Sequence, residues 1–316
     1  YYFAKKKGDY HYRFKINLKD DYLKPMLIMA VPIILGASIN QVNTVIDRRL
    51  ATSISEGAVA TLNYGSKISD SVYALFVTTI TTVMYPALTK QAAKNDFDSL
   101  KATVTNIMNT VTLIVIPASI GMMVLSEPIV ELFLGRGEFA KDPNALSLTA
   151  GVMFFYAIGN IGYGLRDVLV RTFYALQDSV TPVISGVISV VINIALNIIL
   201  SRRMGVSGLA LATSISALFA VLVLYISLYL KVEGMSLRKF LVSSTKIGIA
   251  SIFMGIAAYY TNGFFVAKGV DYKIGLFAGI GVGVIVYGVI MHFMKVEEFD
   301  ELIDMVRDRI RKKRHA

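Results

Sequence analysis

Residues 63–70 read Asn-Tyr-Gly-Ser-Lys-Ile-Ser-Asp and open an otherwise apolar segment that reaches Met84. At the spacing of an α-helix, Asn63, Lys67 and Asp70 fall on one face, and apolar side chains occupy much of the remaining surface. Inserting an ammonium group into a bilayer costs at least about 2.5 to 3.5 kcal/mol, so such a helix turns its polar face toward protein or water. The stretch therefore predicts a membrane helix that contributes a polar face to a site.

Three explanations of Lys67 are consistent with this pattern. As a functional group, its ammonium would bind an anionic substrate. As a structural group, it would neutralise Asp70 three residues later, or it would lie near enough to the membrane surface to reach water. The rest of the chain is needed to choose between them.

The composition is that of a membrane protein. Of the 316 residues, 55% are hydrophobic and 17% are charged, and the mean hydropathy is +0.59. A soluble domain has about a quarter of its residues charged. Apolar runs of about twenty residues, long enough to cross a hydrocarbon core of about 30 Å, recur along the chain. We therefore expect an all-α polytopic membrane protein with about eight transmembrane helices, at residues 22–46, 58–88, 102–125, 144–165, 182–200, 206–230, 241–260 and 274–294.

The residue types exclude several kinds of chemistry. The chain has no Cys, which excludes disulfides, thiolate chemistry and cysteine-ligated metals. The three His residues, at positions 11, 292 and 315, offer no local metal-ligand spacing, so we expect no metal, no cofactor and no catalytic residue. The net charge of +10 is explained by Lys and Arg in cytoplasmic loops rather than by a nucleic-acid partner.

Both ends of the chain are basic. Residues 5–21 and the amphipathic segment from residue 296 are expected to lie on a membrane surface. Eight spans place both ends on one side, and 22 of the 32 Lys and Arg residues then fall on that side against 8 on the other. The positive-inside rule predicts that this side is cytoplasmic. Because residues 1–4 look like the end of a helix and no initiator Met precedes them, we expect the chain to be the carboxy-terminal part of a longer protein.

Five blocks of sequence carry a family resemblance. They are PIILGASINQ at 32–41, LNYGSK at 62–67, YPALT at 85–89, LGRGEF at 134–139 and RTFYALQDSVTP at 171–182. In this order, over eight spans, they resemble the MurJ/MviN family of lipid II flippases. The resemblance covers essentially the whole chain.

The resemblance implies a fold. This family belongs to the MOP transporter superfamily, whose members have two six-helix lobes around a central cavity, and MurJ-like proteins add two helices at the carboxy-terminal end. By this pattern the chain divides into the end of a preceding helix with a basic cytoplasmic loop at 1–21, the second six-helix lobe at 22–232, the two additional transmembrane helices at 233–295 and an amphipathic basic cytoplasmic tail at 296–316.

The resemblance also implies a function. It is the movement of undecaprenyl-linked peptidoglycan precursor (lipid II) across the bacterial cytoplasmic membrane by alternating access, with membrane lipids and the amino-terminal lobe of the same protein as partners. Lys67 stands where the second lobe's cavity arginine is expected, which keeps the positive charge and loses the bidentate geometry of a guanidinium. The expected substrate-binding residues are Lys67, Asn63, Asp70, Asn43 and Arg171.

Other functions stay open from the residues alone. A related polysaccharide-lipid flippase would share this pattern, whereas a multidrug or cation antiporter would place acidic residues in its cavity, and Asp70 is the only acid expected deep in a span. An intramembrane enzyme would need an acid–base cluster at a membrane boundary. The best candidate for such a cluster is Asp167 beside Arg166 and Arg171. An ion pair at the end of a helix would also explain these three residues. A scaffolding module would tolerate the loss of every cavity charge.

Overall fold

The computed structural model describes residues 23–304, apart from 138, 140, 141, 236, 297, 301 and 302. The expected basic segment at 1–21, and the tail from 305 onward, lie outside the described residues. Within them the fold is all-helical, and eight helical spans are long and apolar enough to cross a membrane. The prediction of an eight-span helical membrane protein is confirmed.

The spans follow the expected order. They are α2 (Leu23–Ile54), the continuous segment formed by α3 (Ala58–Val72), the π-helix η1 (Tyr73–Val77) and α4 (Thr78–Ala93), then α5 (Phe97–Val124), α7 (Pro143–Ala175), α8 (Val180–Met204), α9 (Val206–Val232), α10 (Leu237–Ala267) and α11 (Tyr272–Met294). A short helix, α6 (Ser126–Leu134), connects α5 to α7.

Several helices extend beyond the apolar runs from which they were predicted. Helix α2 continues through Asp47, Arg48 and Arg49, and α7 continues through Arg166 and Arg171. The helices therefore end later than the apolar runs predicted. Asp47, Arg48 and Arg166 line a polar cavity, and Arg171 pairs with Asp167, so these charged side chains do not need to face lipid.

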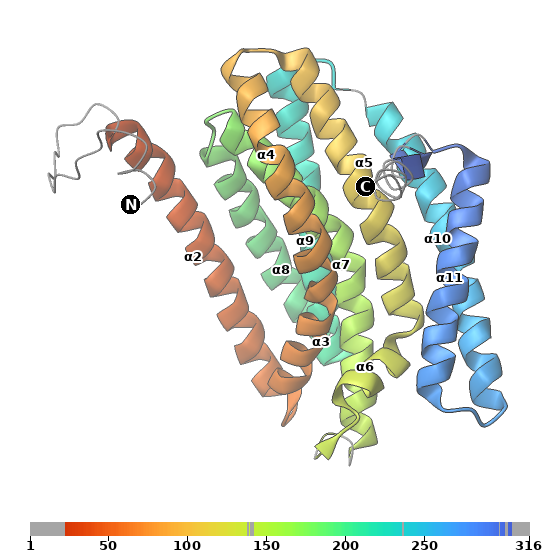
Figure 1. Ribbon diagram of the computed structural model, residues 1–316. Helices are drawn as coiled ribbons and strands as arrows, with labels where there is room; N and C mark the ends of the chain where they lie inside the picture. The colour runs from red at the N-terminus through yellow and green to blue at the C-terminus, as the bar shows by residue number, and fades with distance from the viewer. Residues whose placement is uncertain are drawn as a thin grey trace, which may run out of the picture.

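Helix α7 is the centre of the bundle. It packs against α9, α5 and α3, while α2 lies at one edge and packs mainly on α8 (Figure 1). The helices α10 and α11 form a hairpin at the opposite edge, where α10 packs on α5. The start of α2 and the end of α11 lie at the same end of the bundle (Figure 1).

The corner between α7 and α8 is fixed by Asp178. One carboxylate oxygen accepts hydrogen bonds from the backbone N–H groups of Val180 and Thr181, at 3.1 and 3.0 Å. The other lies 2.6 Å from the Lys231 ammonium at the end of α9. Burial raises the pKa of Asp178, but the hydrogen bonds from Lys231 and Thr181 outweigh it, so this pKa lies below its ordinary value. The corner therefore ties α7, α8 and α9 together at one end.

Glycine allows α7 and α9 to approach closely. A Cβ at Gly159 would lie 2.6 Å from the Ser214 hydroxyl and 3.0 Å from the Ser214 Cα. By contrast, a Cβ at Gly248 on α10 would meet nothing within 4 Å. This close packing of small residues is typical of helix pairs in membranes.

This contact predicts the effect of Gly159→Ala. The added methyl group has to push α9 away, so the free energy of unfolding should fall by about 1 to 3 kcal/mol. The measurement is unfolding of the purified protein in mixed micelles of increasing SDS content, followed by circular dichroism. The matched control, Gly248→Ala, should be neutral or stabilising by up to about 1 kcal/mol, because alanine has the higher helix propensity. Equal effects of the two variants would contradict the assigned contact.

Candidate functional site

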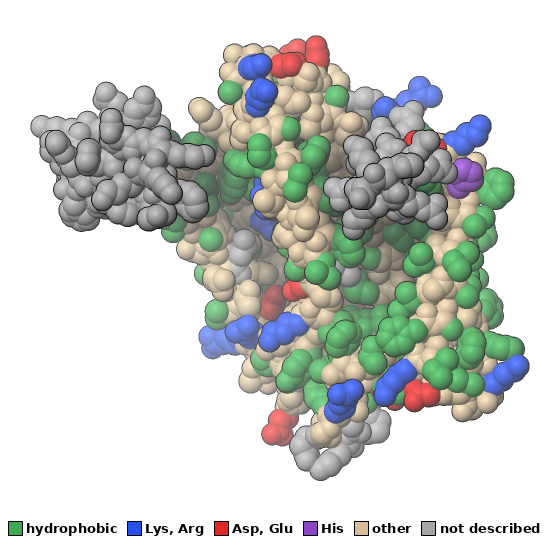
Figure 2. All heavy atoms as spheres, viewed as in Figure 1, with side chains coloured by type: hydrophobic (Ala, Val, Ile, Leu, Met, Phe, Trp, Pro, Cys, Tyr) green, Lys and Arg blue, Asp and Glu red, His purple; other side chains and the backbone are tan. Residues whose placement is uncertain are grey.

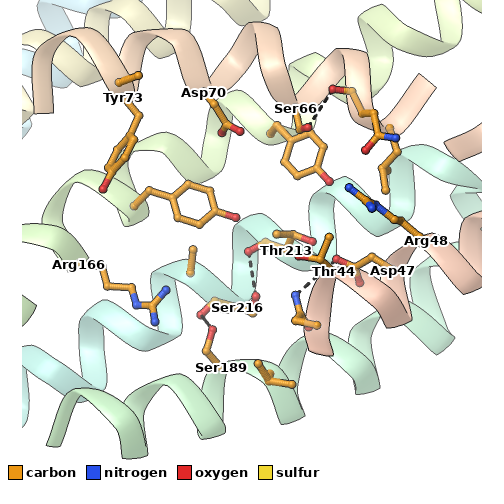
Figure 3. Close-up of a pocket in the computed structure, with 18 residues that line it drawn as sticks. Thr44, Asp47, Arg48, Ser66, Asp70, Tyr73, Arg166, Ser189, Thr213 and Ser216 are labelled. Carbon is orange, nitrogen blue, oxygen red and sulfur yellow. Dashed lines mark hydrogen bonds between the residues drawn. The ribbon is translucent and has the colours of Figure 1, made fainter. Parts of the chain in front are cut away.

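A polar cavity of about 550 Å³ lies among α2, α3, α7, α8 and α9 (Figure 3). Its polar lining residues are Asn43, Thr44, Asp47, Arg48, Asn63, Ser66, Asp70, Tyr73, Tyr156, Tyr163, Arg166, Ser189, Thr213 and Ser216. The cavity is open to the surface, because Arg48 and Asp70 are both exposed while they line it. Polar groups inside membrane spans mark substrate or ion pathways more often than structural positions.

The second span supplies one wall of this cavity. Asn63, Ser66 and Asp70 lie three and four residues apart, so they share one face of α3. At Tyr73 the helix changes to the π-helical segment η1, and Tyr73 still faces the cavity (Figure 3). Single π-helical turns inside α-helices are frequent at functional sites.

Arg166 is the cation that α7 brings to the cavity. It lies at the opposite end from Asp47 and Arg48 (Figure 3), and it also lines an adjoining cavity of about 280 Å³. Its Nε atom is buried and has no hydrogen-bond partner among the described residues. A buried guanidinium donor without a partner is costly, so this group is available to an anionic ligand.

The neighbouring acid does not neutralise Arg166. One oxygen of Asp167 accepts hydrogen bonds from Arg171 at 2.9 Å and from the Thr81 hydroxyl at 2.8 Å. The helix-end ion pair predicted as the structural explanation of Asp167 is confirmed by the Arg171 contact. Asp167 thus pairs with Arg171 and does not neutralise Arg166, whose positive charge faces the cavity.

A buried hydrogen-bond network holds α2 against α8 at the other end of the cavity. Asp47 is only 6% exposed, and the Asn197 amide donates to its carboxylate at 2.6 Å. The Asn43 amide lies 3.4 Å from the second carboxylate oxygen. Because Asp47 lines the cavity, Asp70 is not the only acid deep in a span, which corrects the expectation from sequence.

The predicted site residues are only partly brought together. Asn43, Asn63 and Asp70 line the cavity. Lys67 lies between Ser66 and Asp70 on α3 but is exposed and is not part of the lining. Among the described residues, Lys67 and Asp70 form no ion pair, which argues against the local neutralisation considered above. Arg171 is bonded to Asp167, which lines the adjoining cavity.

Sequence reasoning missed Arg166 and the tyrosines of α7. A signal was present, because Tyr156, Tyr163 and Arg166 are seven and three residues apart and so lie on one face of a helix. It was overlooked because Arg166 was assigned to the end of the span. The residues described by the structure contain no group of three or more His, Cys, Asp or Glu that could hold a metal ion.

Eight apolar spans, five of which enclose an open polar cavity, define a multi-pass membrane protein of the transporter class. The family described as lipid II flippase MurJ matches residues 2–277. The chain belongs to the MurJ family.

Relatives and a solved structure agree with this assignment. A probable lipid II flippase MurJ of Vibrio cholerae is 30% identical over 69% of this chain and 41% of its own length. The probable lipid II flippase MurJ of Thermotoga maritima is 29% identical over 84% of this chain and 52% of its own length. A structure of lipid II flippase MurJ in an inward closed conformation is 26% identical, covers 92% of this chain and 58% of its own, and has a TM-score of 0.69. The chain therefore spans about half the length of the relatives it matches.

Proposed function

We propose that this chain is the second lobe and the two additional helices of a flippase that moves lipid II across the bacterial cytoplasmic membrane. The observation that carries the proposal is the Arg166 guanidinium. It lines a polar cavity within the spans of a MurJ family member, and its Nε donor has no partner in the described part of the chain. A diphosphate-linked headgroup cannot cross hydrocarbon without such a polar path. Alternating access of two lobes about this site would expose it to each side of the membrane in turn.

The proposed headgroup site combines charge with neutral hydrogen-bonding groups. Arg166 offers a guanidinium fork to a phosphate oxygen. Asn43, Asn63 and Asp70 offer amide and carboxylate groups to the sugars and the peptide. Lys67 and Arg171 would attract the anionic headgroup from positions beside the two cavities.

The proposal includes the rest of the assembly. Residues 22–232 would form the lobe, and residues 233–295 would form the added helix pair. The amino-terminal lobe of the same protein would cover the open side of the cavity, where α2 exposes a long apolar surface that includes Met26, Ile34 and Val45. The excess of Lys and Arg at one end supports a cytoplasmic location for both ends of this segment.

Complementation tests the function and the role of Lys67. The protein that contains this chain is expressed in a bacterium depleted of its own lipid II flippase, with Lys67 as wild type, Lys67→Arg or Lys67→Ala at matched membrane levels. We expect growth with Lys and Arg and reduced growth with Ala, because only the first two keep a cation at position 67 beside the headgroup site. Failure of the wild type would overturn the lipid II assignment, and equal rescue by all three would remove Lys67 from the site.

A second candidate is a multidrug or cation antiporter, favoured by the two carboxylates of Asp47 and Asp70 in one cavity. These acids would attract a cationic solute. Efflux of a fluorescent cation from vesicles distinguishes the two functions. Cation efflux without any movement of labelled lipid II would favour the antiporter.

A further inference from the structure

Asp70 is a carboxylate that lines the cavity and is available to a ligand. It comes from α3, lies on the same face as Asn63 and Ser66, and is exposed. In the part of the chain that the structure describes, no side chain donates a hydrogen bond to its carboxylate and no cation pairs with it. The other cavity acid, Asp47, is buried and bonded to the Asn197 amide. Of the two acids, Asp70 is therefore the one that a ligand can reach.

The cavity presents charges of both signs that do not neutralise each other. Asp70 on α3 and Arg166 on α7 both line it (Figure 3), and the Arg166 Nε has no hydrogen-bond partner among the described residues. Arg48, the other cation of the lining, also forms no ion pair with Asp70 within the described part of the chain. Figure 2 shows acidic and basic side chains in the hollow beside α2. This arrangement fits a ligand that carries both an anionic and a cationic group.

The surroundings of Asp70 favour an organic ammonium group as the cationic part of the ligand. Tyr156 and Tyr163 of α7 line the same cavity, and both lie close enough to Asp70 to be affected by its charge. The faces of aromatic rings attract organic cations, and a carboxylate accepts charge-assisted hydrogen bonds from an ammonium group. A carboxylate beside tyrosines in a polar cavity is therefore suited to an amine.

Lipid II, the substrate of the proposed function, carries such an amine. The peptide of a peptidoglycan precursor contains a diamino acid, and a free side-chain amine of this kind is protonated at neutral pH. Cavities of about 300 to 1,000 Å³ hold ligands of drug size, so a cavity of about 550 Å³ holds part of the headgroup. We propose that Asp70 binds the ammonium group of the precursor peptide while Arg166 binds the diphosphate, so that Asp70 selects precursors with a free amine. This inference rests on the proposed function.

Blocking the amine of the substrate tests the proposal. Vesicles that contain the purified full-length protein receive lipid II labelled on its sugar, with the peptide amine either free or acetylated, and the translocation of each form is measured. Acetylation should slow translocation by the wild type about 10- to 100-fold, because it removes a charge-assisted hydrogen bond. Asp70→Asn should slow the free-amine form to about the rate of the acetylated form, so that the preference disappears. Asp70→Glu keeps the carboxylate and should retain a preference for the free amine.

The matched control is Asn63→Ala, which removes a neutral polar group from the same face of α3. It should slow both forms by the same factor and so preserve the wild-type preference. Equal rates of the two forms with the wild type, or a preference that survives Asp70→Asn, would overturn the role of Asp70 and leave the lipid II function intact. If the wild type moved neither form, the proposed function itself would fail, and this inference would fail with it.

Discussion

Replacing Arg166 with alanine is expected to slow the proposed lipid II translocation about 10- to 100-fold, because hydrogen bonds to charged groups contribute about 1.5 to 3 kcal/mol each. The guanidinium lines both adjoining cavities, and its Nε has no partner among the described residues, so a bound phosphate would be its main partner. The measurement is the movement of fluorescent lipid II across vesicles that contain the purified protein. Arg166→Lys should fall between wild type and alanine, because it keeps the charge and loses the bidentate fork.

The matched control for Arg166 is another arginine in a span. Arg203 lies in the last turn of α8 and is exposed. Arg203→Ala removes the same side chain without touching the cavity, so translocation should change by less than twofold. If Arg166→Ala moved lipid II at the wild-type rate while Arg203→Ala behaved as expected, the cavity would not bind the diphosphate through Arg166.

Hydropathy was sufficient to predict the spans but not where the helices end. Each of the eight apolar runs became a helix, because a membrane requires the backbone to satisfy its own hydrogen bonds. The ends were misjudged where charged residues continue a helix, as at Asp47 in α2 and Arg166 in α7. A charged residue ends a membrane span only if its side chain would face lipid. The sequence of a single span does not show which of its faces packs against other helices.

The part of the site that lies on one face of a single helix was predictable from the sequence. The part that several helices form together was not. Asn63 and Asp70 lie on one face of α3, so periodicity alone placed them together. The prediction that Lys67 shares this face was less secure. Lys67 follows Ser66 directly, and consecutive residues of an α-helix are rotated by about 100° around its axis. Arg166 reaches the same cavity from α7 about a hundred residues later, and only tertiary packing brings it there.

The two ends of the cavity differ in whether their charged side chain has hydrogen-bond partners. At one end, Asp47 is held by the Asn197 amide and is almost completely buried. At the other end, the Arg166 Nε has no hydrogen-bond partner among the residues that the structure describes. A satisfied charge fixes the position of two helices, whereas an unsatisfied one is available to a ligand. We therefore expect substitutions at the first end to act on stability and substitutions at the second to act on transport.

Asn197→Leu is the sharpest test of the first end. Leucine removes the 2.6 Å hydrogen bond to Asp47, a carboxylate that is 6% exposed, and leaves it the longer contact to Asn43 and the hydrogen bond from Thr213. A buried charged group without its donor costs about 3 kcal/mol, so the free energy of unfolding should fall by about that amount. Titration of the purified protein with SDS, followed by circular dichroism, measures this change.

A second substitution separates the lost hydrogen bond from the change in shape. When both partners of a buried hydrogen bond become apolar, the cost is nearly removed, so Asp47→Leu with Asn197→Leu should be more stable than Asn197→Leu alone. The control Asn106→Leu replaces an exposed asparagine of α5 and should change stability by no more than about 0.5 kcal/mol. If the double variant were less stable than Asn197→Leu, Asp47 would stabilise the fold through contacts other than Asn197. The network would then not be what holds α2 against α8.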